Sequence, residues 1–229
     1  MRNNETISKE DHIYNEIKSA IINRKIGPRT HLSEKQLAEV FNVSRTPVRQ
    51  VLQRLQFEKF VEIMPNRGAF IYEPTLKEIE EIFQLRGLLE VEAVRLACQK
   101  ATKEQLENLE MLTHKEDALY REDDYGKVLP IINEIHLGIV RLSGVELLSR
   151  FCKELIDLTS IYLAFYDNPS KDPKGPEEHR QIIRLIRQKR EKEAQEACLS
   201  HLTRVKDLLV YQKGKETSTD MSNVFKPVF

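Results

Sequence analysis

A tight turn at residues 42–43, flanked by two amphipathic helical patterns, constrains the fold more than any other feature of this chain. Ser33 precedes the first pattern, and Gln36 follows three residues later, which predicts a capping box. Ser44 is expected to cap the second helix. Pro47 falls in the first turn of that helix, where a missing N–H costs nothing. The pattern therefore predicts a short helix, a turn and a second helix ending near residue 57.

Two short apolar segments follow, at residues 60–63 and 69–72, and they alternate as β-strands do. The residues between them are rich in turn formers, so we expect a hairpin. A further helix is expected at residues 11–26, and a short strand at residues 30–32. A helix-turn-helix followed by a hairpin is a winged helix, and this predicts a DNA-binding domain over residues 1–74.

Arg45 and Arg49 lie four residues apart at the start of the second helix and therefore project together. Their guanidinium groups match the O6 and N7 acceptors of guanine in the major groove. A solvated helix face would also carry two arginines, but the accompanying turn and hairpin favour DNA binding. The other expected DNA contacts are Lys35 beside the backbone, Ser44 and Thr46 at the helix N-terminus, and Arg67 and Gly68 at the hairpin tip.

Composition adds weaker constraints. The formal net charge is zero, although residues 1–74 carry 12 Lys and Arg against 9 Asp and Glu. The three cysteines show no paired spacing, which predicts buried free thiols in a reducing compartment. We find no signal-peptide pattern and no 18-residue apolar stretch. These features predict a cytoplasmic protein with no membrane partner.

Beyond a short linker at residues 73–75, helical periodicity dominates and the chain is expected to be mainly α. Thr75 is expected to cap the first of these helices. Short loops imply an antiparallel bundle of six to seven helices over residues 75–212. A flexible tail is expected over residues 213–229. The expected helices span residues 76–99, 103–121, 125–142, 145–167, 177–189 and 191–211.

Three histidines, His136, His179 and His201, occupy the inward faces of three of these helices. A single inward histidine is usually a hydrogen-bonded core residue. Three imidazoles gathered in one bundle core can instead bind Zn²⁺, Ni²⁺ or a similar ion. Arg86 lies on an apolar stripe, where it can pair with Glu90 four residues later or bind a carboxylate ligand.

The winged-helix region resembles that of the GntR family of bacterial transcription regulators. The later part resembles the all-helical FCD-type effector domain of the FadR subfamily. The first resemblance covers about residues 10–72, and the second is spread over residues 78–210. The residues that carry the two resemblances are Leu37-Ala38, Val43 to Arg49, Leu52, Leu55, Asn66 to Ile71, Leu85-Arg86, Leu89-Glu90, Ile135-His136, Ser143-Gly144, Glu178 to Arg180, Ile182 and His201-Leu202.

The resemblance implies a homodimer on a roughly palindromic double-stranded DNA operator. It also implies a small effector, which we expect to be a carboxylate. Metal-binding members of the family use one Asp and three His, with the Asp four residues before the first His. Ile132 stands at that position here, and Asn133 is offset by one. The expected effector contacts are Arg86, Asn133, His136, His179 and His201, of which the three histidines are also the candidate ligands for one Zn, Ni or Mn ion per chain.

Together these features predict a transcription regulator, and specifically a repressor whose DNA binding responds to the effector. Two alternatives remain open. The first is a constitutive DNA binder whose bundle serves only dimerisation. The second is a metal-dependent enzyme, against which stands the lack of a partnered nucleophile or general base by spacing. The alternative to a metal site is a metal-free polar pocket in which the histidines hydrogen-bond an organic ligand directly.

Overall fold

The computed structural model describes residues 8–23, 25–121, 125–166, 174–210 and 224–225. The chain forms two compact units, one made of residues 1–73 with 215–229 and the other of residues 74–214. The fold is mainly α-helical, with one small antiparallel sheet in the first unit. Among the described residues, no helix is long and apolar enough to cross a membrane.

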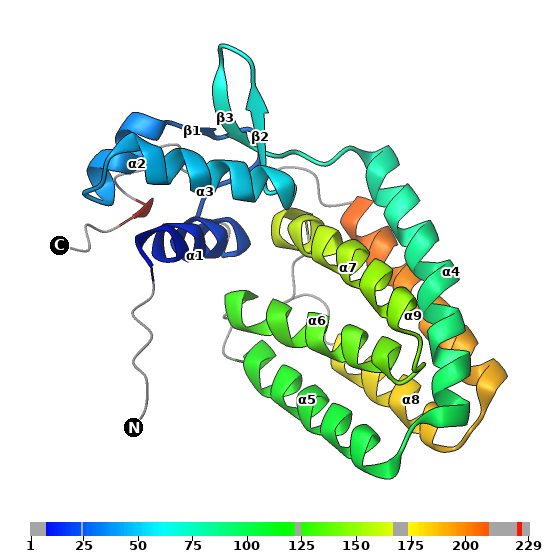
Figure 1. The fold of residues 1–229 in the computed structure, drawn as a ribbon. Helices are drawn as coiled ribbons and strands as arrows, with labels where there is room; N and C mark the ends of the chain where they lie inside the picture. The colour runs from blue at the N-terminus through cyan, green and yellow to red at the C-terminus, as the bar shows by residue number, and fades with distance from the viewer. Residues whose placement is uncertain (1–7, 24, 122–124, 167–173, 211–223, 226–229) are drawn as a thin grey trace, which may run out of the picture. The chain divides into compact units, whose positions relative to one another are not determined.

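The first unit is a winged helix (Figure 1). Helix α1 packs against α3, α2 packs against α3, and the strands follow in the order β1-β3-β2. Asn42, in the turn between α2 and α3, has a φ of 49°. The elements are α1 (Lys9–Ile22), β1 (His31–Leu32), α2 (Glu34–Val40), α3 (Arg45–Phe57), β2 (Val61–Met64) and β3 (Gly68–Ile71).

In this unit one helix start and the capping bonds of two other helices differ from the sequence expectation. Helix α1 begins at Lys9 because the Ser8 hydroxyl accepts a hydrogen bond from the Asp11 amide. Ser44 occupies the N-cap of α3, but its side chain makes no capping hydrogen bond. Ser33 accepts from the amide of Gln36, and this is only half of the expected capping box.

The reciprocal capping box instead begins the first helix of the second unit. There the Thr75 hydroxyl accepts from the Glu78 amide, and the Glu78 carboxylate accepts from the Thr75 amide. This unit contains six helices among its described residues. They are α4 (Leu76–Lys100), α5 (Lys103–Arg121), α6 (Tyr125–Arg141), α7 (Glu146–Tyr166), α8 (Gly175–Arg187) and α9 (Glu191–Val210).

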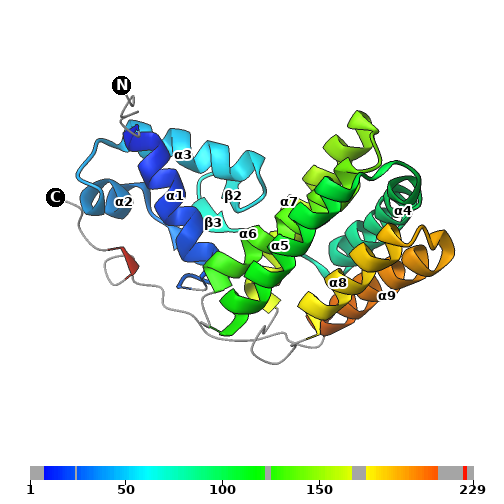
Figure 2. The same ribbon diagram turned by 90° about the horizontal axis from the view of Figure 1, so that it is seen from below.

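These six helices close into a ring (Figures 1 and 2). Helix α4 packs on α9, α9 on α8, α8 on α5, α5 on α6, α6 on α7, and α7 on α4. Helix α8 begins two residues earlier than expected, because Pro176 fits its first turn. The ring encloses an interior to which every helix can contribute side chains.

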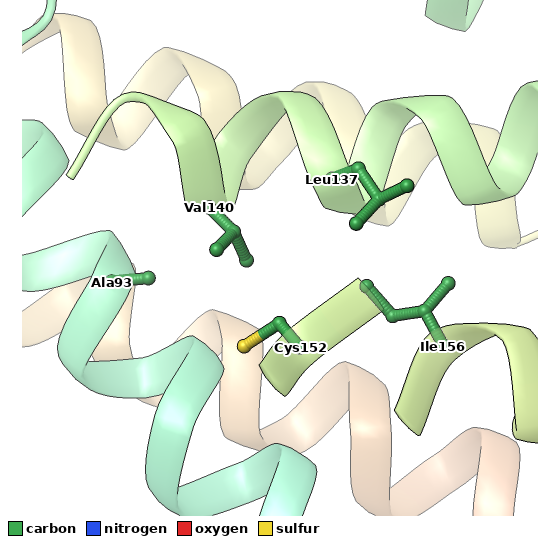
Figure 3. Packing of buried hydrophobic residues seen from close by; sticks show 5 residues of the cluster. All are labelled: Ala93, Leu137, Val140, Cys152 and Ile156. Atoms are coloured by element: carbon green, nitrogen blue, oxygen red, sulfur yellow. The ribbon is translucent and has the colours of Figure 1, made fainter. Parts of the chain in front are cut away.

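An apolar cluster joins α4, α6 and α7 on one side of this interior (Figure 3). It consists of Ala93, Leu137, Val140, Cys152 and Ile156, all at most 7% exposed. All three cysteines are buried free thiols, as expected. Burial raises the pKa of the Cys152 thiol to about 12, so this cysteine serves as a core residue rather than a nucleophile.

The described part of the C-terminal segment belongs to the winged-helix unit. Phe225 is 3% exposed, and its ring centroid lies 5.4 Å from that of Phe41, the residue that ends α2. Composition alone did not predict this contact. The rest of the tail expected over residues 213–229 lies outside the described residues.

Candidate functional site

Helix α3 has one buried and one exposed face. Its inward stripe, formed by Val48, Val51, Leu52 and Leu55, is at most 2% exposed. That packing fixes the rotation of the helix, so Arg45 and Arg49 both project into solvent. The predicted contacts Lys35, Ser44 and Thr46 are exposed as well.

Arg49 has a partner that the sequence reading missed. Its Nε donates to Glu34 Oε1 at 3.0 Å, and its Nη2 donates to Glu34 Oε2 at 2.8 Å. The hydrogen bonds from Arg49 lower the pKa of the Glu34 carboxyl, and the charges of Arg49 and Arg45 lower it further. No sequence spacing pairs these two residues, because they meet only when α2 packs across α3.

The wing tip requires glycine. Gly68 has a φ of +94°, and a β-carbon there would lie 2.8 Å from Nε2 of His31. The Arg67 amide donates to the Met64 carbonyl at 3.1 Å and closes the turn. Both Arg67 and Gly68 are exposed, as the DNA-contact hypothesis requires.

A second candidate site lies inside the helical ring. His136 on α6, His179 on α8 and His201 on α9 are each at most 6% exposed. One ligand atom from each of the three lies within 4.8 Å of the others. These three histidines could therefore bind a metal ion.

Each imidazole is held by a different glutamate. His136 Nδ1 lies 2.8 Å from Glu90 Oε2, and His179 Nδ1 lies 2.8 Å from Glu116 Oε2. The third pair joins His201 Nδ1 and Glu178 Oε2 at 2.7 Å. A neutral imidazole that donates from Nδ1 leaves its Nε2 lone pair free, and metal-binding histidines use this arrangement.

Two of these histidines are held in the neutral form. Burial lowers the pKa of His136 to about 4, although the Glu90 charge opposes the shift. Burial likewise lowers the pKa of His201 to about 3, against the hydrogen bond to Glu178. At neutral pH these rings are therefore acceptors at Nε2.

The Nε2 atoms converge without a donor between them. His201 Nε2 lies 3.4 Å from His136 Nε2, and buried His179 Nε2 has no hydrogen-bond partner in the described part of the chain. If both Nδ1 atoms carry protons, the two close Nε2 atoms cannot form a hydrogen bond with each other. A divalent cation satisfies such converging lone pairs, so the donor arrangement fits a metal ion.

Two of these three glutamates, Glu90 and Glu178, also accept hydrogen bonds from an arginine. Arg86 Nε donates to Glu90 Oε1 at 2.5 Å, and Arg204 donates to Glu178 at 2.5–2.6 Å. Burial alone would raise the pKa of Glu90, but the Arg86 charge and His136 hold it well below its usual range. The bonds from His201 and Arg204 lower the pKa of Glu178 to about 2, despite partial burial.

Two buried polar atoms beside the histidines, Arg86 Nη2 and Glu116 Oε1, have no hydrogen-bond partner among the described residues. Both residues line a small cavity of about 40 Å³ together with the three histidines. Ile132 and Asn133 also line it, and the Asn133 amide donates to Ser160 Oγ at 2.6 Å. The fold thus brings together all five predicted effector-site residues, with an isoleucine side chain in the wall.

The sequence reading missed Glu116 and the role of Glu178. A signal for Glu116 was present, because it continues the buried stripe of Leu106, Leu109 and Thr113 at helical spacing. Glu178 gave no such signal, since it neighbours His179 in sequence but binds His201 in space.

A winged-helix unit joined to a helical unit with a polar interior site defines a two-unit transcription regulator. Residues 9–71 match the gntR family of bacterial regulatory proteins, and residues 81–204 match the FCD domain. The chain therefore belongs to the GntR family, with an FCD domain in its second unit. GntR regulators bind DNA operators and effector ligands, and FCD domains commonly bind metals.

Relatives agree with this assignment. The chain is 30% identical over 180 residues to the Nta operon transcriptional regulator of Aminobacter aminovorans, spanning 76% of this chain and 82% of that protein. It is 28% identical over 209 residues to the HTH-type regulator YdhC of Bacillus subtilis, spanning 89% and 92%. The solved structure of McbR/YncC from E. coli shares the fold, with a TM-score of 0.73, 22% identity, and coverage of 91% and 100%. These relatives are transcriptional regulators rather than enzymes.

Proposed function

We propose that this protein is a repressor whose operator binding is controlled by a small carboxylate bound inside the helical ring. The observation that carries the proposal is the buried polar centre of His136, His179 and His201, placed in the same chain as a winged helix. A buried group of polar atoms that is left partly unsatisfied is costly, and a ligand removes that cost.

For DNA binding, Arg45 and Arg49 would read base edges, while Ser44, Thr46 and Lys35 would hold phosphates. The Ser44 side chain makes no capping bond, which leaves its hydroxyl available for this role. Arg67 and Gly68 would bring the wing to a minor groove. A homodimer would present two such heads and read two inverted half-sites.

For metal binding, the three Nε2 atoms would hold one divalent ion per chain. Imidazole donors suit Zn²⁺ or Ni²⁺ better than Mn²⁺, which prefers oxygen. An ion held there would supply a positive charge and Lewis acidity for an anionic oxygen of the effector. Glu90, Glu116 and Glu178 would keep each ring in the correct orientation.

For effector binding, Arg86 Nη2 is a buried donor with no partner within the residues that the structure describes, and it would bind a carboxylate oxygen. The cavity of about 40 Å³ is far smaller than ordinary ligand pockets of roughly 300–1,000 Å³. The effector is therefore small, or surrounding side chains move when it binds. The same small volume favours one alternative, a constitutive DNA binder whose ring serves only dimerisation.

The test begins with the full-length protein and a random DNA pool, from which bound duplexes are selected. We expect an inverted repeat whose binding is abolished by the double substitution of Arg45 and Arg49 with Ala. Elemental mass spectrometry of protein purified without chelator is expected to find about one Zn or Ni per chain, lost in His179→Ala. Small carboxylates are then added to the labelled duplex, and we expect release by the effector, with a coupling of about 1–3 kcal/mol.

Two results would overturn the proposal. If the arginine variant still selects the same repeat, the assigned DNA contacts are wrong. If neither metal removal nor any carboxylate alters DNA affinity or the melting temperature, the constitutive alternative is correct, because a ligand of the folded state must raise stability.

A further inference from the structure

We propose that Glu34 is a positioning residue for base recognition, which holds the Arg49 guanidinium in the orientation that reads guanine. The inference rests on the proposed DNA-reading role of Arg49 and adds a specificity-determining residue on a different helix. It is carried by the bidentate contact at 3.0 and 2.8 Å between the Arg49 guanidinium and the Glu34 carboxylate.

The contact leaves the reading edge of the guanidinium free. Arginine has five N–H groups, and Glu34 engages the Nε–H and one N–H of Nη2. The second N–H of Nη2 and the two of Nη1 remain, and one from each nitrogen points along the axis of the side chain. That pair is the one a guanine accepts at O6 and N7. Arg49 can therefore bind Glu34 through its Nε–H and one N–H of Nη2 while it binds a base through N–H groups of Nη1 and Nη2.

The contact also determines where Arg49 points. The Arg49 side chain is 60% exposed, whereas that of Glu34, at the start of α2, is 34% exposed. Fixing a long side chain before binding removes an ordering cost that the complex would otherwise carry. An exposed ion pair is weak in water, but displacement of water by DNA strengthens it.

A carboxylate near DNA also repels phosphate. This repulsion acts at every sequence alike and cancels in the ratio of two affinities. The positioning of Arg49 acts only where Arg49 meets its base, so it is the effect that raises discrimination. A merely structural role for Glu34 would not have this signature, because loss of α2 stability lowers affinity for all DNA alike.

The experiment compares Glu34→Gln with Glu39→Gln in the full-length protein. Glu39 lies on the same helix, is 64% exposed, and pairs only weakly with Lys35 at 3.9 Å, so its substitution removes the same charge without touching Arg49. Affinity is measured for the duplex selected by the wild type, for each single-base variant of it, and for random DNA. Arg49→Lys, alone and combined with Glu34→Gln, completes a double-mutant cycle.

We expect Glu34→Gln to lower discrimination at one base pair per half-site roughly twofold to tenfold, with unchanged or higher affinity for random DNA. Glu39→Gln should leave the base profile intact, and Glu34→Gln should add no further loss to Arg49→Lys. The inference is overturned if Glu34→Gln keeps the wild-type base profile, or if it tightens the selected site more than random DNA, which would show that Glu34 competes with the base for Arg49. If Arg49→Lys itself keeps the profile, the proposed reading role of Arg49 fails instead.

Discussion

Replacing Glu90 with Gln should destabilise the helical unit strongly. Glu90 and Arg86 are both 3% exposed in their side chains, and Glu90 also accepts from His136. Glutamine keeps the volume, but it removes the charge and directs an NH₂ group at one of two donors. Removing one partner of a buried ion pair costs about 3–5 kcal/mol. For a unit of about 140 residues, unfolding entropy near 0.3 kcal/mol per kelvin converts this to a drop of roughly 10–17 °C.

Thermal unfolding followed by circular dichroism measures this shift, and zinc affinity is measured in parallel by competition with a chromogenic chelator. A double variant, Arg86→Met with Glu90→Met, separates stability from function. It should recover most of the lost stability because no charge is left buried alone. Its zinc affinity should stay roughly tenfold to a hundredfold below wild type, because His136 has lost the partner that orients it. A loss below about 1 kcal/mol in Glu90→Gln would refute the reasoning.

Three further outcomes are expected. Ile132→Asp should bind zinc at least roughly tenfold more tightly than wild type in chelator competition. Without metal the variant should be less stable, because it adds a buried carboxylate. Equal zinc affinity would show that residue 132 does not face the ion. Burial would raise the pKa of Glu58, but hydrogen bonds from Lys18 and Tyr14 hold it lower. The stability that Glu58 contributes is therefore present above pH about 4.3 and lost as the pH falls further. Glu58→Gln should make the free energy of unfolding of the winged helix less dependent on pH between about pH 5 and 3. An unchanged pH dependence would count against the contact. Phe225→Ala should lower the melting temperature of the winged helix. The loss in free energy of unfolding should be at or below the low end of the ~3–5 kcal/mol typical of buried phenylalanine, and Phe225→Leu should cost less. An equal loss in both variants, or no loss, would show that Phe225 does not pack there.

The winged helix was predictable because its signals are local. The turn at residues 42–43, the inward stripe of α3 and the glycine at the wing tip each act within a few residues, and hydrophobic periodicity sets which faces are buried. Cap details were less predictable, since Ser33 and Ser44 both suit an N-cap but only the hydrogen bonds reveal how each is used.

The candidate site was predictable only in part. Inward spacing on separate helices pointed to His136, His179 and His201, and a resemblance to a known family drew attention to Arg86. The i,i+4 partner of Arg86, Glu90, was predictable from spacing. The partners of the three histidines were not, because hydrogen bonds between helices depend on the rotation and offset of each pair. Glu178 binds His201 rather than its sequence neighbour, and Glu116 reaches His179 across α5 and α8.

The sequence by itself determined the elements and the residues that face inward, because helix periodicity and turn chemistry are properties of short segments. The tertiary structure decided which buried charges meet. Only the packed ring places His136 against Glu90 and turns three imidazoles toward one point, and only the packing of α2 across α3 brings Glu34 to Arg49. The physical reason is that a buried polar atom is stable only when it is hydrogen-bonded, and the packing of the helices determines which partners lie within reach.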